Sequence, residues 1–333
     1  MTRERLAGVA RAAFGGGRRL DAVERLRGGS KKGVYRLAFD GGGTAIAYVW
    51  SAGEDYWPGA PAERDDSDPL AHASGAGLFE AAHRRLTALG VRTPRVHLLD
   101  RSGRHLPADV AVVEDVPGEN LEALLDRDPD TARPVLARLA ATLDTLRRHG
   151  DAPSYGKLAL LDNGGTSRGR SCEQLIRDRA LADLAEAAAR DTRIAAARER
   201  LTDLLHARYA AVRPRTRYGL VHGELGPDHV LVDAAGEPVL IDIEGLMHFD
   251  PEWEHAFLRI RLGSHYPLLR TENSEALDRE RLALHTLAMR LSLVAGPLRL
   301  LDGDFPHRAA MLAIAEHNLG EALALAAEGE QWP

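Results

Sequence analysis

The chain changes character at Pro117-Gly118, and this change constrains the fold more than any other feature. Before it, short apolar runs separated by turn residues predict strands, with few helices among them. After it, Leu and Ala recur at helical spacing, and only one hairpin pattern interrupts them. Strands gathered in one half and helices in the other are typical of an α+β protein. We therefore expect a small N-terminal β-sheet domain, residues 1–117, and a larger, mainly helical domain, residues 118–333.

The N-terminal half predicts two helices and several strands. One helix is amphipathic and covers residues 2–14, and the other covers 78–89, where apolar residues share a face. Strands are expected between residues 23 and 50, including 34–39 and 45–50, and in the segments 95–99 and 110–116. Asp40 to Gly43 predicts a hairpin turn, because glycine tolerates the positive φ that such turns need. The stretch 51–74 is rich in Pro, Gly, Asp and Ser and predicts a loop.

The C-terminal half predicts helices around one hairpin. Residues 121–212 are mostly helical, with one loop near 151–170. Residues 220–242 contain a short apolar run, a polar turn and a hairpin, and the chain is helical again from residue 251 to its end.

Composition narrows the class of protein. The chain is 44% hydrophobic and 28% charged, as soluble globular proteins are, and no apolar run approaches the roughly 20 residues of a membrane helix. Its formal net charge of -6 argues against a nucleic-acid binder. Cys172 is the single cysteine, and the basic N-terminus lacks the apolar stretch of a signal peptide. We expect a cytoplasmic protein that binds neither nucleic acid nor membrane.

The segment 220–244 is the strongest candidate for a functional site. Apolar strands flank a polar loop that Gly and Pro bend, and a turn at 234–237 brings the two ends of the segment together. The side chains of Glu224, His229 and Asp242 can therefore converge at one site.

This segment resembles the aminoglycoside phosphotransferase and choline kinase superfamily. That family shows His-Gly-Asp, an Asn five residues after the Asp, and an Ile-Asp-x-Glu segment thirteen residues further on. Glu224, His229 and Asp242 keep both spacings. The resemblance implies a bilobal, protein-kinase-like fold that binds a nucleotide between its lobes. It also implies that Glu224 is the catalytic base and that Asp242 and His229 hold Mg²⁺.

The resemblance extends in order from about residue 26 to 257. It includes a Gly-rich hairpin that covers phosphates, a helix with a supporting glutamate, a hinge whose backbone meets adenine, and an Asp-Pro-x-x-acid segment. It implies contacts with the nucleotide at Gly28, Gly29, Ser30, Lys31, Lys32, Gly33, Glu80, Glu114 and Val116.

Three positions depart from the family pattern. Glu224 replaces the catalytic Asp, and His229 replaces the Asn. The strand at 45–51 carries no cation, where the family has Lys or Arg. Lys31 or Lys32 can supply the missing charge from the glycine loop, since Lys157 is the only other lysine. The alternative is that nucleotide affinity is reduced or that the pocket holds another ligand.

The resemblance implies a phosphotransferase that uses ATP or GTP with Mg²⁺. The acceptor would be a hydroxyl of a small molecule, such as an antibiotic, an amino alcohol or a sugar. Acids cluster between Glu244 and Glu254, where the family borders its acceptor, so both are candidate substrate contacts and favour a cationic acceptor. A Ser or Thr of a peptide is a further alternative. A pseudokinase, which binds a nucleotide or metabolite and regulates a partner without phosphoryl transfer, would explain all three departures.

Overall fold

The computed structural model describes residues 1–57, 65–149, 151–269 and 277–328. Two compact units can be distinguished in it. Unit 1 contains residues 1–57, 72–138 and 227–245, and unit 2 contains residues 58–71, 139–226 and 246–333. Each unit contains segments from both sides of residue 117. The predicted division at this residue stays a prediction. Parts of the predicted loop 51–74 and of the helical C-terminal part, namely 58–64, 270–276 and 329–333, lie outside the described residues.

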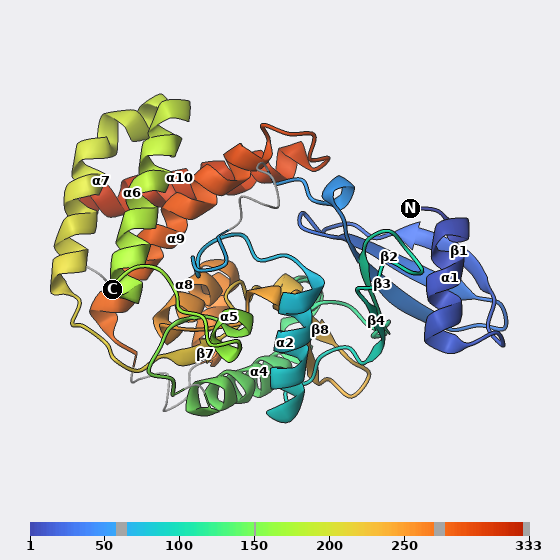
Figure 1. Ribbon diagram of the computed structural model, residues 1–333. Coiled ribbons are helices and arrows are strands. Elements are labelled where there is room, and N and C mark those ends of the chain that lie inside the picture. The colour runs from blue at the N-terminus through green and yellow to red at the C-terminus, as the bar shows by residue number, and fades with distance from the viewer. Residues whose placement is uncertain (58–64, 150, 270–276, 329–333) are drawn as a thin grey trace. The chain divides into compact units, whose positions relative to one another are not determined.

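Unit 1 is built on one antiparallel sheet with the strand order β1-β2-β3-β5-β4 (Figure 1). Its strands are β1 (Leu20–Arg25), β2 (Gly33–Phe39), β3 (Thr44–Trp50), β4 (Val96–Asp100) and β5 (Asp109–Glu114). The hairpin between β2 and β3 turns at Asp40 to Gly43, where Gly41, Gly42 and Gly43 have φ of 80°, 92° and 87°. The strands and this turn confirm the sequence prediction.

The two faces of this sheet pack against different helices. Tyr35, Leu37 and Phe39 alternate along β2 and belong to the same buried cluster as residues of α1 (Arg3–Phe14). On β3, Tyr48 and Trp50 instead contact Phe79 of α2 (Ala76–Ala88), with ring centroids 5.8 and 5.6 Å apart. Because both faces are covered, β3 is buried from Ala45 to Trp50.

A hairpin from the second half of the sequence belongs to unit 1. It consists of η3 (Pro227–His229), β8 (Val230–Val232), β9 (Pro238–Leu240) and η4 (Ile243–Gly245). The Val232 N–H donates to the Glu119 carbonyl just before α3 (Leu121–Arg127), and the Leu240 N–H donates to the Arg92 carbonyl after α2. These backbone bonds, 3.0 and 2.9 Å long, tie the hairpin to the segments that follow α2 and β5.

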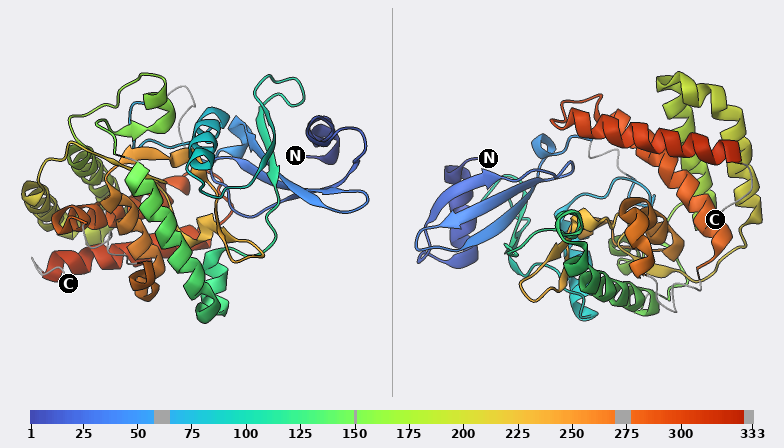
Figure 2. Two further views of the ribbon diagram at one scale, coloured as in Figure 1. Left: turned by 90° about the horizontal axis from the view of Figure 1, so that it is seen from below. Right: turned by 180° about the vertical axis from the view of Figure 1, so that it is seen from behind.

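Unit 2 is mainly helical. Its principal helices α6, α7, α9 and α10 pack together, with α6 and α7 side by side and α10 running across them (Figures 1 and 2). The helices are α5 (Leu158–Asp162), α6 (Cys172–Arg190), α7 (Thr192–Ala211), α8 (Pro251–Leu262), η5 (Gly263–Leu269), α9 (Arg279–Leu300) and α10 (Arg308–Glu328), with α4 (Pro129–His149) running from unit 1 into unit 2. In the part of the chain that the structure describes, no helix is both long and apolar enough to cross a membrane.

Unit 2 also contains a small antiparallel sheet, of which the sequence predicted only the strand that precedes the polar loop of the segment 220–244. Its order is β6-β10-β7, with β6 (Gly156–Lys157), β10 (Met247–Phe249) and β7 (Gly219–Val221). β6 lies within the predicted loop 151–170, and β10 lies between the predicted hairpin and the helix after it. Strands of two or three residues show no alternation, so their pairing is decided by tertiary contacts.

His255 of α8 is buried in unit 2 as a neutral ring. Its Nδ1 lies 3.0 Å from the Tyr266 hydroxyl. Burial lowers the pKa of His255 to about 4. The unfolded chain takes up a proton as the pH falls through about 6.5, whereas the folded chain does so only near pH 4. The free energy of unfolding therefore falls between these values, by up to about 1.4 kcal/mol per pH unit.

We expect His255→Asn to flatten this pH dependence, because asparagine keeps a hydrogen-bonding group but does not titrate. Urea unfolding at pH 6.5, 5.5 and 4.5 should show a slope that is smaller by about 1.4 kcal/mol per pH unit than in the wild type. His285, whose pKa burial lowers to about 3, is present in both proteins and contributes equally to both slopes. Equal slopes would contradict the assignment to His255.

Candidate functional site

A buried lysine from the glycine loop is the centre of the candidate site. Lys32 immediately precedes β2 and is only 4% exposed. Its Nζ lies 2.5 Å from Asp242 Oδ1 and 2.5 Å from Glu244 Oε1, and 5.1 Å from the centre of the Tyr48 ring. Burial alone would lower the pKa of Lys32, but Asp242 and Glu244 outweigh it and hold the pKa above its usual value. Lys32 is therefore a permanent cation inside unit 1.

The backbone of the glycine loop turns this lysine inward. Gly28 and Gly29 have φ of 92° and 72°, which only glycine adopts readily. A Cβ on Gly29 would lie 2.5 Å from the Lys32 carbonyl oxygen. The loop is also held by side chains, because Ser30 Oγ accepts from Trp57 Nε1 at 2.9 Å and the Lys31 carbonyl accepts from Ser74 Oγ at 2.9 Å. The conformation thus depends on both glycines and on these contacts.

Asp242 has a strained backbone, which is typical of functional positions. Its φ of 57° is the only positive value at a non-glycine residue in the described part of the chain. The preceding Ile241 N–H donates to the His229 carbonyl at 3.0 Å, and Asp242 Oδ2 lies 3.7 Å from His229 Nε2. Burial alone would raise the pKa of Asp242, whereas Lys32, and then His229, lower it well below its usual range.

Asp242 and His229 can serve a metal ion that arrives with phosphates. Within the described residues, no group of three or more His, Cys, Asp and Glu side chains has the geometry of a metal site. Mg²⁺ typically takes one or two carboxylates and completes its shell with phosphates and water. Asp242 fits this use, while an imidazole such as His229 suits softer ions better. The assignment of Asp242 and His229 as metal ligands stays a prediction, and the carboxylate is the better suited of the two to Mg²⁺.

Other predicted nucleotide contacts lie apart from Lys32. Glu80 on α2 has a side chain that is 49% exposed and approaches Arg101, at 3.7 Å, as its ion-pair partner. Glu114 ends β5, and its carboxylate accepts from Arg92 Nη2 at 2.8 Å. Val116, two residues further, is buried. The positions of Glu114 at the end of β5 and of Val116 just after it are compatible with the predicted hinge, which stays a prediction.

The loop that carries Glu224 belongs to unit 2 and is braced by Glu254. The Glu254 carboxylate is buried and accepts backbone N–H groups from His222, Gly223 and Leu225, at 2.5, 3.1 and 3.1 Å. Trp253 Nε1 also donates to the Gly223 carbonyl at 3.2 Å. Glu254 and Trp253 therefore fix the residues on both sides of Glu224. The sequence predicted Glu254 as a substrate contact, but both of its oxygens are already occupied by the loop.

The remaining acids of this region have partners too. In unit 2, Asp250 Oδ2 accepts from Arg281 Nη1 at 2.5 Å, and Glu252 pairs with Arg215 at 2.6 Å. In unit 1, Glu244 is paired with Lys32. The acidic cluster seen in the sequence is therefore compensated internally, and it does not present an open negative surface.

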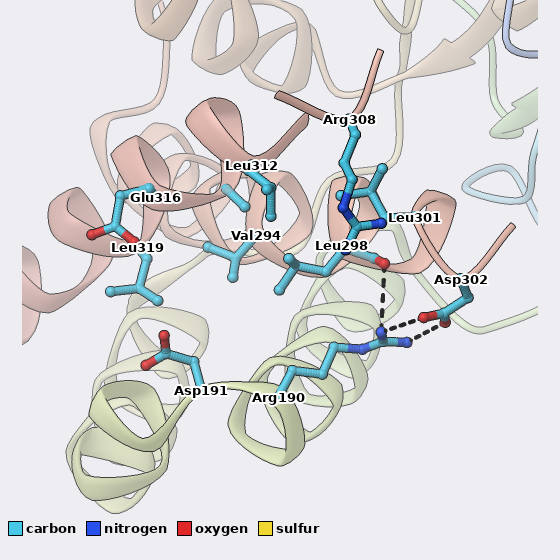
Figure 3. A pocket seen from close by; sticks show the side chains of 11 residues that line it. Arg190, Asp191, Val294, Leu298, Leu301, Asp302, Arg308, Leu312, Glu316 and Leu319 are labelled. Carbon is cyan, nitrogen blue, oxygen red and sulfur yellow. Dashed lines mark hydrogen bonds and ion pairs between the residues drawn. The ribbon is translucent and has the colours of Figure 1, made fainter. Parts of the chain in front are cut away.

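A cavity of about 270 Å³ lies elsewhere in unit 2, between the α6–α7 connection and helices α9 and α10 (Figure 3). Its wall includes Val294, Leu298 and Leu312, and at its edge Arg190 pairs with Asp302 at 2.7 Å. None of the residues predicted from the sequence lines it, so it is distinct from the candidate site.

Comparisons with known proteins agree with this geometry. The profile of the phosphotransferase enzyme family named APH matches residues 36–299. The aminoglycoside phosphotransferase APH(4)-Ia has a TM-score of 0.63 at 16% identity, with 99% of this chain and 100% of the other covered. The choline kinase LicA from Streptococcus pneumoniae has a TM-score of 0.59 at 13% identity, with 93% and 94% covered. A search of curated protein sequences finds no match.

These comparisons establish the fold. At such low identity the solved structures support architecture alone, and the architecture is the predicted one: an α+β, kinase-like fold with an N-terminal antiparallel sheet and a mainly helical C-terminal part. The predicted resemblance is confirmed.

We expect Glu254→Gln to destabilise the loop, because an amide has one acceptor oxygen and its NH₂ group would face a backbone donor. Leaving one or two buried N–H groups unpaired costs about 1–3 kcal/mol each. Urea unfolding should show a loss in this range, whereas Glu316→Gln on exposed α10 should change stability by less than about 0.5 kcal/mol. A similar small effect at both positions would show that Glu254 does not brace the loop.

Proposed function

The chain belongs to the APH phosphotransferase enzyme family, and from this premise we propose that it transfers the γ-phosphate of ATP or GTP to a hydroxyl of a small molecule. The observation that carries the proposal is the buried cluster of Lys32, Asp242 and Glu244. It places a cation suited to phosphates beside a carboxylate suited to their metal ion. Phosphoryl transfer needs this combination, because its catalysis rests largely on positioning and charge stabilisation.

Unit 1 supplies the proposed nucleotide contacts. Backbone N–H groups of the glycine loop, residues 28–33, would face phosphate oxygens, and Lys32 would pair with them. The backbone of Glu114 and Val116 would meet the purine. Asp242, with His229, would hold Mg²⁺, which neutralises phosphate charge when it is bound. Related structures contain ADP with hygromycin B in one case and GDP with kanamycin in another, which supports a nucleotide as donor.

Unit 2 supplies the proposed catalytic base, Glu224. Its reference pKa is about 0.4 units above that of the Asp in the family motif, so it can accept a proton equally well. Its extra methylene group moves the carboxylate, and the loop around it is held by Glu254. We propose that Glu224 orients the acceptor hydroxyl and takes its proton as the bond to phosphorus forms.

The acceptor is proposed to be a small molecule with a free hydroxyl group. Similar solved structures contain hygromycin B or kanamycin, and the choline kinase is named for choline. The prediction of a cationic acceptor rested on Glu244 and Glu254, and both carboxylates have internal partners. The proposal therefore specifies the hydroxyl and leaves the charge of the acceptor open.

A pseudokinase is the second candidate. One observation that favours it is the direct contact of Lys32 with Asp242, because this contact occupies an oxygen of a proposed metal ligand. The other is the replacement of the family's Asp by Glu224 and of its Asn by His229. Such a protein would bind nucleotide without turning it over.

The test of phosphoryl transfer uses Glu224. With labelled ATP and an acceptor found by screening, Glu224→Gln should lose about 10²–10⁴-fold in turnover while ATP affinity changes little. Glu224→Asp should not exceed the wild type, because its shorter side chain would then misplace the carboxylate in a site built for Glu.

Two other outcomes have distinct meanings. A Glu224→Asp variant that is faster than the wild type would indicate a decayed kinase whose family geometry can be restored. No product from any of the three proteins, together with measurable ATP binding, would favour the pseudokinase and contradict the proposed activity.

We expect Asp242→Asn to abolish the metal-dependent part of nucleotide binding. A neutral amide binds Mg²⁺ more weakly than a carboxylate does. The thermal stabilisation by ATP should be larger with Mg²⁺ than with EDTA in the wild type and equal under both conditions in the variant. A variant that keeps the difference would exclude Asp242 as a metal ligand.

A further inference from the structure

The lysine of this site lacks the expected helix partner. By the family resemblance, Glu80 on α2 should support the phosphate-binding lysine. In the structure α2 faces β3 with Phe79, which packs on Tyr48 and Trp50, while Glu80 is directed to Arg101. An aromatic contact thus occupies the place where an ion pair between strand and helix was expected.

Glu244 holds Lys32 in its place. Its Oε1 accepts from Lys32 Nζ at 2.5 Å and from Trp50 Nε1 at 3.2 Å, and the residue is 4% exposed. Trp50 is on the strand that carries no cation, and its ring is fixed between Tyr48 and Phe79, with centroids 6.1 and 5.6 Å away. Because the indole cannot move freely, its N–H fixes the Glu244 carboxylate, and the carboxylate fixes the ammonium group.

We propose that Glu244, held by Trp50, is the residue that positions Lys32 for the nucleotide phosphates, an inference that rests on the proposed function. Lys32 has three N–H donors, and two of them are used by Glu244 and Asp242. When phosphates enter, Lys32 can exchange Asp242 for a phosphate oxygen and keep Glu244. Asp242 is then released for the metal ion, while a buried counter-charge stays beside the ammonium group.

The experiment compares two glutamates that lie in the same unit. ATP and adenosine affinities are measured by calorimetry for the wild type, Glu244→Gln and Glu80→Gln, each with Mg²⁺ and with EDTA. Glu244→Gln should weaken ATP binding about tenfold, as expected for losing one charge-assisted contact, and should leave adenosine binding unchanged. The loss should persist in EDTA, because positioning of Lys32 does not require the metal. Glu80→Gln should retain the affinity of the wild type for ATP.

Trp50→Phe provides a milder variant, since it keeps an aromatic ring against Phe79 and removes only the N–H donor. It should weaken ATP binding about threefold, and adenosine binding not at all. Lys32→Met tests whether Glu244 affects ATP binding only through Lys32. In the Lys32→Met background, Glu244→Gln should cause no further loss, because a positioning residue acts only through the group that it positions.

Four results would overturn the inference alone while the wild type binds ATP. The first is a loss of ATP affinity in Glu80→Gln without one in Glu244→Gln, and the second is an equal loss of affinity for ATP and for adenosine in Glu244→Gln. The third is a loss of ATP affinity in Glu244→Gln that vanishes in EDTA. The fourth is a loss of ATP affinity in the Glu244→Gln, Lys32→Met double variant that equals the sum of the two single losses. The third would assign Glu244 to the metal ion. A wild type that binds neither ATP nor GTP would overturn the proposed function and this inference with it.

Discussion

A single buried ammonium group organises the proposed nucleotide site of this protein. Lys32 comes from a loop, yet it is held by two carboxylates from the β8–β9 hairpin and its end, about 210 residues further along the chain. An unpaired charge at such a depth would be strongly destabilising, so the loop, the hairpin and β3 are energetically interdependent. Loss of one carboxylate would leave the ammonium group with a single counter-charge, and loss of both would leave it uncompensated. This constraint explains why the hairpin 227–245 is part of unit 1 although its sequence neighbours belong to unit 2.

The acids of unit 2 show that local composition is a poor guide to a ligand. Asp250, Glu252 and Glu254 alternate with other residues over five positions of the sequence and could be taken as a negative surface. Each is buried, and each neutralises or caps a different internal group: Arg281, Arg215 and the backbone of the loop around Glu224. Buried carboxylates are tolerated only with such partners. These contacts hold the loop and the start of α8, and the role of Glu254 as a substrate contact stays a prediction.

Elements with a clear periodicity or a sharp turn could be predicted from the sequence. The β2–β3 hairpin followed from three glycines between alternating strands, and α2 from the apolar face that includes Phe79 and Leu86. The short strands β6 and β10 could not, because two or three residues carry no periodic signal and are paired only by tertiary contact. Among site residues, the sequence spacing of His229 and Asp242 predicted that the two side chains lie close together. The distance of 3.7 Å between His229 Nε2 and Asp242 Oδ2 agrees with this prediction. The partner of the lysine was not predicted, since the family resemblance implied Glu80 for this role and gave Glu244 only as a substrate contact.

The sequence by itself determined the fold class, the family motif and the scarcity of lysine, because these depend on residue types and their spacing. It limited the proposed phosphate-binding cation to Lys31 or Lys32 without choosing between them. Only the tertiary structure decided that Lys32 is the buried one and that Glu244 and Trp50 hold it. The physical reason is that adjacent residues of a loop point in different directions, and their environments depend on strands and hairpins that are distant in sequence. Which charge is desolvated, and what compensates it, is a property of packing alone.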